Sequence, residues 1–133
     1  MKRSGVAILG STGSIGTATL RVVERHADRF RPVALTAYEN VALLTQQART
    51  ASPEYVGIVK PNANSDPAWA TGPDCLVDAA TRADVDVVVN AVVGAAGLRA
   101  TVAALRAGKR VALANKETLV MGGELVLAAC AEG

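Results

Sequence analysis

Short apolar runs alternate with segments of helical periodicity along this chain, and no other feature constrains its fold as strongly. The predicted strands are residues 5–9, 32–37, 55–59, 86–93 and 110–114, and the predicted helices are residues 15–26, 41–49, 75–82, 98–107 and 118–131. Alternation of this kind gives an open parallel sheet with right-handed crossovers and helices on both faces. The sequence therefore predicts an α/β fold, a Rossmann-like doubly wound parallel sheet in three α/β/α layers.

Several segments carry more specific local signals. Three successive valines, Val87–Val89, leave no period-two alternation, which predicts a strand in the middle of the sheet with helices over both faces. Arg31-Pro32 predicts a break before the second strand, Asn40 is predicted to cap the second helix, and residues 60–72 are predicted to form a loop. The first helix is predicted to bury one apolar face, made of Ile15, Ala18, Val22 and Val23.

The composition excludes several classes of protein. With 133 residues, 50% of them apolar, the chain is predicted to form one domain, residues 1–133, with a buried core. A formal net charge of +2 and 3% aromatic residues argue against nucleic-acid binding. Two cysteines and one histidine provide neither a disulfide framework nor a metal-ligand set, which favours the reducing cytoplasm. Because no stretch approaches the roughly 18 apolar residues of a membrane span, we expect a soluble protein.

Gly10, Gly13 and Gly16 form a glycine-rich turn between the first predicted strand and the first predicted helix. A phosphate-binding turn at this place needs one residue with positive φ, one without a Cβ where a pyrophosphate approaches, and one small residue where helix meets strand. The helix start adds unpaired N–H groups and a partial positive charge, so we predict phosphate binding here. Further hydroxyl donors are available on Ser11, Thr12 and Ser14.

The spacing of these glycines, GxxGxxG, differs from the GxGxxG of the common dinucleotide fingerprint. The alternative interpretation is a strand-to-helix turn whose glycines serve packing alone. The strand before the turn, the helix after it and the hydroxyls between the glycines favour phosphate binding over that alternative.

Tyr38, Glu39 and Asn40 close the second predicted strand, where folds of this class meet the adenosine ribose of a dinucleotide. A carboxylate at this point holds the 2′-hydroxyl of NAD and repels the 2′-phosphate of NADP, so Glu39 taken alone favours NAD. The alternative is that Glu39 faces solvent at a helix N-terminus, where its charge suits the helix dipole. The two interpretations fit the residues equally well.

Two later segments also follow strands, at the edge of the sheet where ligands bind. Gly94–Gly97 could let a nicotinamide pass over the backbone, or could serve close packing of helix on strand. Asn115, Lys116 and Glu117 could contact a cofactor, a phosphate or a carbonyl group, and the alternative is a capped helix start with a solvated Lys-Glu pair.

Taken together, four blocks carry a resemblance to one family. They are GSTGSIG at Gly10–Gly16, TLRVV at Thr19–Val23, VVGAAGL at Val92–Leu98 and LANKETLV at Leu113–Val120. Over residues 6–123 the chain resembles the 1-deoxy-D-xylulose 5-phosphate reductoisomerases. The last block beside GAAGL is specific to that family, whereas the glycine turn is shared with several dehydrogenases.

The resemblance implies the N-terminal NADPH-binding domain of an enzyme that isomerises and reduces 1-deoxy-D-xylulose 5-phosphate to 2-C-methyl-D-erythritol 4-phosphate in isoprenoid biosynthesis. It implies a homodimer, with Mg²⁺ or Mn²⁺ held by a separate catalytic domain. In the turn that starts at Gly10, the cofactor phosphates would be held by Thr12, Gly13, Ser14 and Ile15. The adenosine ribose would lie at Tyr38, Glu39 and Asn40; the cofactor would also contact Asn115 and Glu117, and the substrate Lys116.

The chain departs from the family pattern at three places. The position of Glu39 commonly carries a basic residue, residues 60–84 are shorter than usual, and the chain ends before the carboxylate-rich segment that binds the metal. We therefore expect nucleotide binding without turnover and no metal ligands in this chain. Two alternatives are a domain of another oxidoreductase, of the homoserine or semialdehyde dehydrogenase type, and a non-catalytic nucleotide-sensing module. For the former, Cys75 and Cys130 lie in predicted helices and do not resemble activated nucleophiles.

Overall fold

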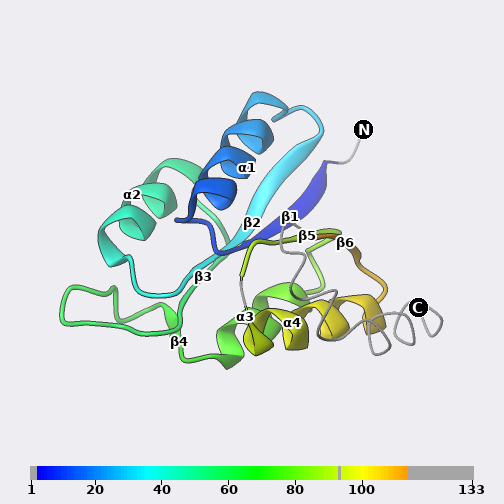
Figure 1. Cartoon of the computed structure of the whole chain (residues 1–133). Coiled ribbons are helices and arrows are strands. Elements are labelled where there is room, and N and C mark those ends of the chain that lie inside the picture. Colours follow the sequence, from blue (N-terminus) through cyan, green and yellow to red (C-terminus); the bar gives the residue numbers. More distant parts are fainter. Residues whose placement is uncertain (1–2, 93, 114–133) are drawn as a thin grey trace.

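The structure is a computed structural model that describes residues 3–92 and 94–113. Its elements are β1 Ser4–Leu9, α1 Ser14–Arg25, β2 Phe30–Ala37, α2 Val41–Ala51, β3 Tyr55–Ile58, β4 Ala70–Thr71, α3 Asp74–Ala80, β5 Val87–Asn90, α4 Ala95–Arg106 and β6 Arg110–Leu113. The described residues form a parallel sheet in the order β4-β3-β2-β1-β5-β6. Helices α1 and α2 cover one face and α3 and α4 cover the other (Figure 1), which confirms the predicted three-layer, doubly wound fold. The predicted helix at 118–131 lies outside the described residues.

Two apolar clusters hold these layers together, one on each face of the sheet. On β5, Val88 belongs to the cluster under α3 and α4, whereas Val87 and Val89 contact the cluster under α1 and α2. Strand β5 lies between β1 and β6 and is apolar toward both layers. The interpretation of the valine run as an inner strand covered on both faces is therefore confirmed.

The buried face of α1 differs from the prediction. The helix buries Gly16, Leu20 and Val23, while Ile15 is 49% and Val22 is 50% exposed. Ala18 is exposed as well, so the predicted face was right only for Val23. The reason is that Gly16 has no side chain, and this lets the helix turn its glycine toward the turn after β1 and come closer than a larger residue would allow. A prediction from apolar periodicity alone does not count glycine as a buried residue, so it could not place Gly16 on the buried face of α1.

Strand β2 begins at Phe30 and runs through Pro32, so the predicted break at Arg31-Pro32 is wrong. The register against β1 shifts between Val6 and Ala7, opposite the proline. Strand β3 pairs with β2 only from Ala34 onward. Pro32 therefore lies at an irregularity, on a stretch with one neighbouring strand, where a missing N–H leaves no gap in the central ladder.

Three further boundaries differ from the sequence-based expectation. Residues 70–71 of the predicted loop form the short edge strand β4. Helix α4 starts at Ala95, whereas the sequence predicted residue 98. Strand β5 ends at Asn90 because the side chain of Asn90 accepts a hydrogen bond from the Val92 backbone N–H (3.0 Å) and so turns the chain out of the sheet.

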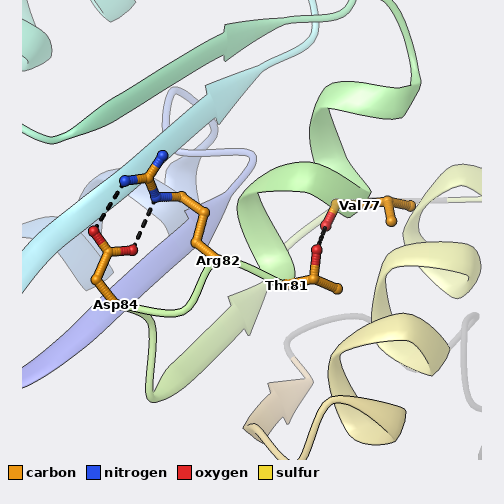
Figure 2. A network of polar contacts seen from close by, with 4 residues as sticks. All are labelled: Val77, Thr81, Arg82 and Asp84. Atoms are coloured by element: carbon orange, nitrogen blue, oxygen red, sulfur yellow. Dashed lines mark hydrogen bonds and ion pairs between the residues drawn. The ribbon is translucent and has the colours of Figure 1, made fainter.

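An ion pair holds the link from α3 to β5, at the edge of the sheet where the parallel strands begin. Arg82 donates from Nε and from its terminal nitrogen to the two carboxylate oxygens of Asp84, each at 2.9 Å (Figure 2). The Arg82 guanidinium also lies over the Tyr55 ring, 5.5 Å from its centroid. Chiefly through the hydrogen bond from Arg82, the pKa of the Asp84 carboxyl is lowered from its ordinary value.

We expect Asp84→Asn to lower the free energy of unfolding at pH 7 by about 0.5–1 kcal/mol, because the pair is partly exposed and screened by water. The folded-state pKa of Asp84 is lowered, so its stabilisation is present above the unfolded-state pKa and is lost as the pH falls through the folded-state pKa. Urea unfolding at pH 7 and near pH 3 should therefore show the difference between variant and parent shrinking in acid. Asp28→Asn, at an exposed aspartate outside both ion pairs of the described residues, is the matched control. A pH-independent difference would contradict the assignment.

Within the part of the chain that the structure describes, no helix is both long enough and apolar enough to span a membrane.

Candidate functional site

A cleft of about 550 Å³ opens at the carboxyl edge of the sheet. The chain leaves β1 toward β2 on one side and later returns to β5 on the other, so the strand order reverses at this point. Ligands of open α/β sheets bind outside the strand ends at such a reversal. The cleft is lined by Gly10, Thr12, Gly13, Thr36, Ala37, Tyr38, Val59, Pro73, Leu76, Ala91, Val92 and Ala96.

The glycine-rich turn after β1 forms one wall of this cleft. Gly10 has φ +83°, and the backbone N–H groups of Gly10 and Ser11 both donate to the Thr36 carbonyl, at 3.0 and 2.8 Å. A Cβ on Gly16 would lie 2.0 Å from the Gly10 carbonyl oxygen. Two of the three roles predicted for the glycines, positive φ at Gly10 and close helix packing at Gly16, are therefore confirmed.

Gly13 differs from the other two glycines because no contact among the described residues requires a glycine there. Its φ is −74°, and of the described atoms an added Cβ would meet only the Gly10 carbonyl oxygen, at 3.7 Å. Gly13 precedes α1 as its N-cap, makes no side-chain cap, and is followed by exposed Ser14 and Ile15. The first N–H groups of α1 therefore face open space beside the cleft, with the positive end of the helix dipole behind them.

Ser11 does not take the role predicted for its hydroxyl. It is fully buried, and its Oγ donates to Oε1 of Gln47 on α2 (2.8 Å). In return, Nε2 of Gln47 donates to the Ser11 carbonyl oxygen (2.8 Å). The expectation of Ser11 as a phosphate donor is therefore wrong, and the pair instead fixes the turn to α2. Sequence reasoning did not find Gln47, because a glutamine in a helix carries no signal of burial.

We expect Gln47→Leu to lower the free energy of unfolding by roughly 2 kcal/mol, because it leaves the buried Ser11 hydroxyl without its partner and removes the shorter of two hydrogen bonds to the Ser11 carbonyl. Nucleotide affinity should fall as well, since the turn loses its attachment to α2. Gln46→Leu is the matched control, because Gln46 is the exposed neighbour on the same helix. Urea unfolding and nucleotide titration of both variants provide the check, and equal stability of the two would contradict the role of Gln47.

The second small-residue turn, between β5 and α4, resembles the first: one glycine has positive φ, and a later glycine packs closely against the backbone of the turn. Gly94 has φ +84°, and a Cβ on Gly97 would lie 2.5 Å from the Val92 carbonyl oxygen. Buried Asn90 donates from Nδ2 to the Gly97 carbonyl (2.8 Å) and to the Thr101 hydroxyl (2.6 Å). For Gly97 the structure supports the packing interpretation. The sequence signal for the role of Asn90 was a single asparagine inside an otherwise apolar run.

The residues at the end of β2 divide between two hollows. Tyr38 is 61% exposed and lines the cleft, whereas Glu39 and Asn40 line a second surface hollow of about 510 Å³. Asn40 caps α2 as predicted, with its Oδ1 accepting from the Leu43 N–H at 3.2 Å. Both interpretations of Glu39 remain compatible with its exposed place before α2.

The structure thus brings together most of the predicted site residues. Gly10, Thr12, Gly13 and Tyr38 line one cleft, and Ser14, Ile15, Glu39 and Asn40 lie beside it. The predicted roles of Asn115, Lys116 and Glu117 fall outside the described residues, as does Cys130.

Cys75 is unsuited to serve as a nucleophile. It is buried in the cluster under α3 and α4. Burial first, and then the charges of Asp78 and Asp74, raise the pKa of its thiol to about 11. A thiol with so high a pKa is almost entirely protonated at neutral pH and is a poor nucleophile. The expectation that Cys75 is not an activated nucleophile is therefore confirmed.

Comparison with known proteins settles the family. The sequence profile of 1-deoxy-D-xylulose 5-phosphate reductoisomerase matches residues 6–123. The chain belongs to this family. It is 48% identical to the 1-deoxy-D-xylulose 5-phosphate reductoisomerase of Geotalea uraniireducens over 131 residues, which cover 92% of this chain and 34% of that protein. The chain therefore spans about a third of the length of this relative.

Solved reductoisomerases share its fold closely. The enzyme from Zymomonas mobilis in complex with NADPH is 42% identical with a TM-score of 0.88, over 98% of this chain and 37% of that one. A reductoisomerase in complex with magnesium has a TM-score of 0.90 at 40% identity, over 98% and 35% of the two chains. A homoserine dehydrogenase from Thiobacillus denitrificans reaches a TM-score of 0.64 at 25% identity, so that alternative is not better supported.

Proposed function

We propose that residues 1–133 are the NADPH-binding domain of a 1-deoxy-D-xylulose 5-phosphate reductoisomerase. The observation that carries this proposal is the free space at Gly13, where an uncapped helix start opens beside the cleft. A dinucleotide pyrophosphate fits this space because it needs close approach, N–H donors and a positive helix end. The solved relative in complex with NADPH supports the choice of nucleotide.

Each described site residue then has a task. The N–H groups and hydroxyls of residues 12–15 hold the pyrophosphate. The exposed ring of Tyr38 offers a flat apolar surface for the adenine. The mostly apolar lining of the cleft excludes water from the bound nucleotide. Bound NADPH supplies a hydride, and the protein supplies its position. Asn115 and Glu117 are proposed as further cofactor contacts, and Lys116 as a substrate contact.

For the whole enzyme we propose conversion of 1-deoxy-D-xylulose 5-phosphate to 2-C-methyl-D-erythritol 4-phosphate, in isoprenoid biosynthesis, by a cytoplasmic homodimer that uses Mg²⁺ or Mn²⁺. The metal would chelate substrate oxygens and polarise the carbonyl. Among the described residues, no group of three or more His, Cys, Asp or Glu could hold such an ion. We therefore place the metal ligands outside the described residues.

Calorimetric titration of the 133-residue chain with NADPH and with NADH tests the proposal. We expect saturable heat with NADPH, and no oxidation of NADPH when 1-deoxy-D-xylulose 5-phosphate and Mg²⁺ are added. Absence of heat with both nucleotides at millimolar concentration would overturn the proposed function. Turnover by this chain alone would overturn the expectation, taken from the family pattern, that the chain carries no metal ligands.

A further inference from the structure

A lysine, Lys60, is bonded through its backbone to the residue that precedes Glu39. The pairing of β2 with β3 continues past the ends of both strands, since Val59 N–H donates to the Ala37 carbonyl (3.0 Å) and Lys60 N–H to the Tyr38 carbonyl (2.7 Å). The register of the pair matches Ala37 with Ile58. Strands β2 and β3 end at Ala37 and Ile58, and the bond from Lys60 places its backbone next to Tyr38, one residue before Glu39.

NADPH carries its extra phosphate at this corner. In folds of this class the end of the second strand meets the adenosine ribose, and a nearby cation accommodates a 2′-phosphate. Glu39 carries a negative charge, as the 2′-phosphate does, so a bound NADPH would be repelled there unless a cation lies close by. Glu39 and Lys60 are both exposed, and neither belongs to the two ion pairs of the described residues.

Several other cations of the described residues lie at the opposite edge of the sheet. Parallel strands begin at one common edge, and Arg3, Arg31 and Arg110 stand where β1, β2 and β6 begin. At the carboxyl edge, Arg99 on α4 is already paired with Asp74 of α3 at 3.2 Å. Among the described residues, Lys60 is thus the basic residue whose backbone is bonded directly to the end of β2.

We propose that Lys60 determines the preference of this chain for NADPH over NADH, by placing its ammonium group against the 2′-phosphate of NADPH. The inference rests on the proposed function, because it assigns one corner of the same nucleotide site. It also removes the conflict that Glu39 creates, since a cation in the segment after β3 serves in place of one after β2. Glu39 then remains free to accept from the ribose hydroxyls.

The test compares the affinities of NADPH and NADH in Lys60 variants of the 133-residue chain. We expect Lys60→Gln to weaken NADPH binding by roughly five- to tenfold, as befits a partly solvated charged hydrogen bond, and to leave NADH binding within about twofold. Lys60→Arg should keep the preference, and Lys60→Glu should reverse it. Lys109→Gln, at a lysine before β6 on the opposite edge, is the matched control and should change neither affinity.

The outcomes separate the two claims. A ratio of NADPH to NADH affinity that is the same in Lys60→Gln and in the unmodified chain would overturn the role of Lys60 and leave the proposed function standing. Failure of the unmodified chain to bind either nucleotide would overturn the proposed function and this inference with it. A second readout is ionic strength, because the salt dependence of NADPH affinity should decrease in Lys60→Gln and that of NADH should not.

Discussion

Gly13→Val is expected to abolish NADPH binding while the fold of the chain persists. We expect the valine side chain to fit in the free protein, because within the described part of the chain a Cβ at this position meets only the Gly10 carbonyl oxygen, at 3.7 Å. Its φ of −74° is open to any residue. That room is the space which the proposed function gives to the pyrophosphate. We expect affinity to fall by at least about a hundredfold, which corresponds to about 2.8 kcal/mol.

Stability should change little in the same variant. Valine is a poorer N-cap than glycine, so the free energy of unfolding should fall by about 1 kcal/mol. Ala18→Val is the control, because it also introduces a valine, at an exposed position of α1 away from the turn. Calorimetry and urea unfolding of both variants provide the check. Normal NADPH affinity in Gly13→Val would show that the turn is structural only.

Gly16→Ala is expected to have the opposite profile, with the damage in the fold itself. Its Cβ would lie 2.0 Å from the Gly10 carbonyl oxygen and 2.7 Å from the Cα of Ser11, and both are backbone atoms of the turn. Inside a helix, alanine is normally favoured over glycine by about 1 kcal/mol. We nevertheless expect the free energy of unfolding to fall by about 2–3 kcal/mol, because either α1 or the turn must move.

Gly13→Ala is the matched control for this second prediction, since it makes the same chemical change three residues earlier without a close contact. Urea unfolding should separate the two variants clearly. Nucleotide binding should also weaken in Gly16→Ala, because displacement of the turn moves the start of α1. Equal stability of the two alanine variants would contradict the packing role assigned to Gly16.

Much of the site could be predicted from the sequence because its signals are local. A strand, a glycine turn and a helix follow one another within residues 4–25, and the positive φ of Gly10 is a property of that short segment. The valine run of β5 and the capping asparagine before α2 are equally local. The blocks that carry the family resemblance include these same segments.

The polar supports of the site could not be predicted in this way. Gln47 and Ser11 are 36 residues apart in the chain, and only the packing of α2 beside the turn after β1 makes them partners. The direction of the Ser11 hydroxyl follows from that contact. Asn90 likewise acquires its role from the way α4 comes back over β5.

The sequence by itself determined the order of strands and helices, the alternation that makes the sheet parallel, and the glycine turn that opens the cleft, because each depends on backbone preferences and periodicity over a few residues. Only the tertiary structure decided which side of α1 is buried, which hydroxyls face inward, and which basic residue is bonded through its backbone to the end of β2. Those outcomes depend on strand register and on how closely a helix approaches the sheet, and both are set by contacts between residues distant in the chain.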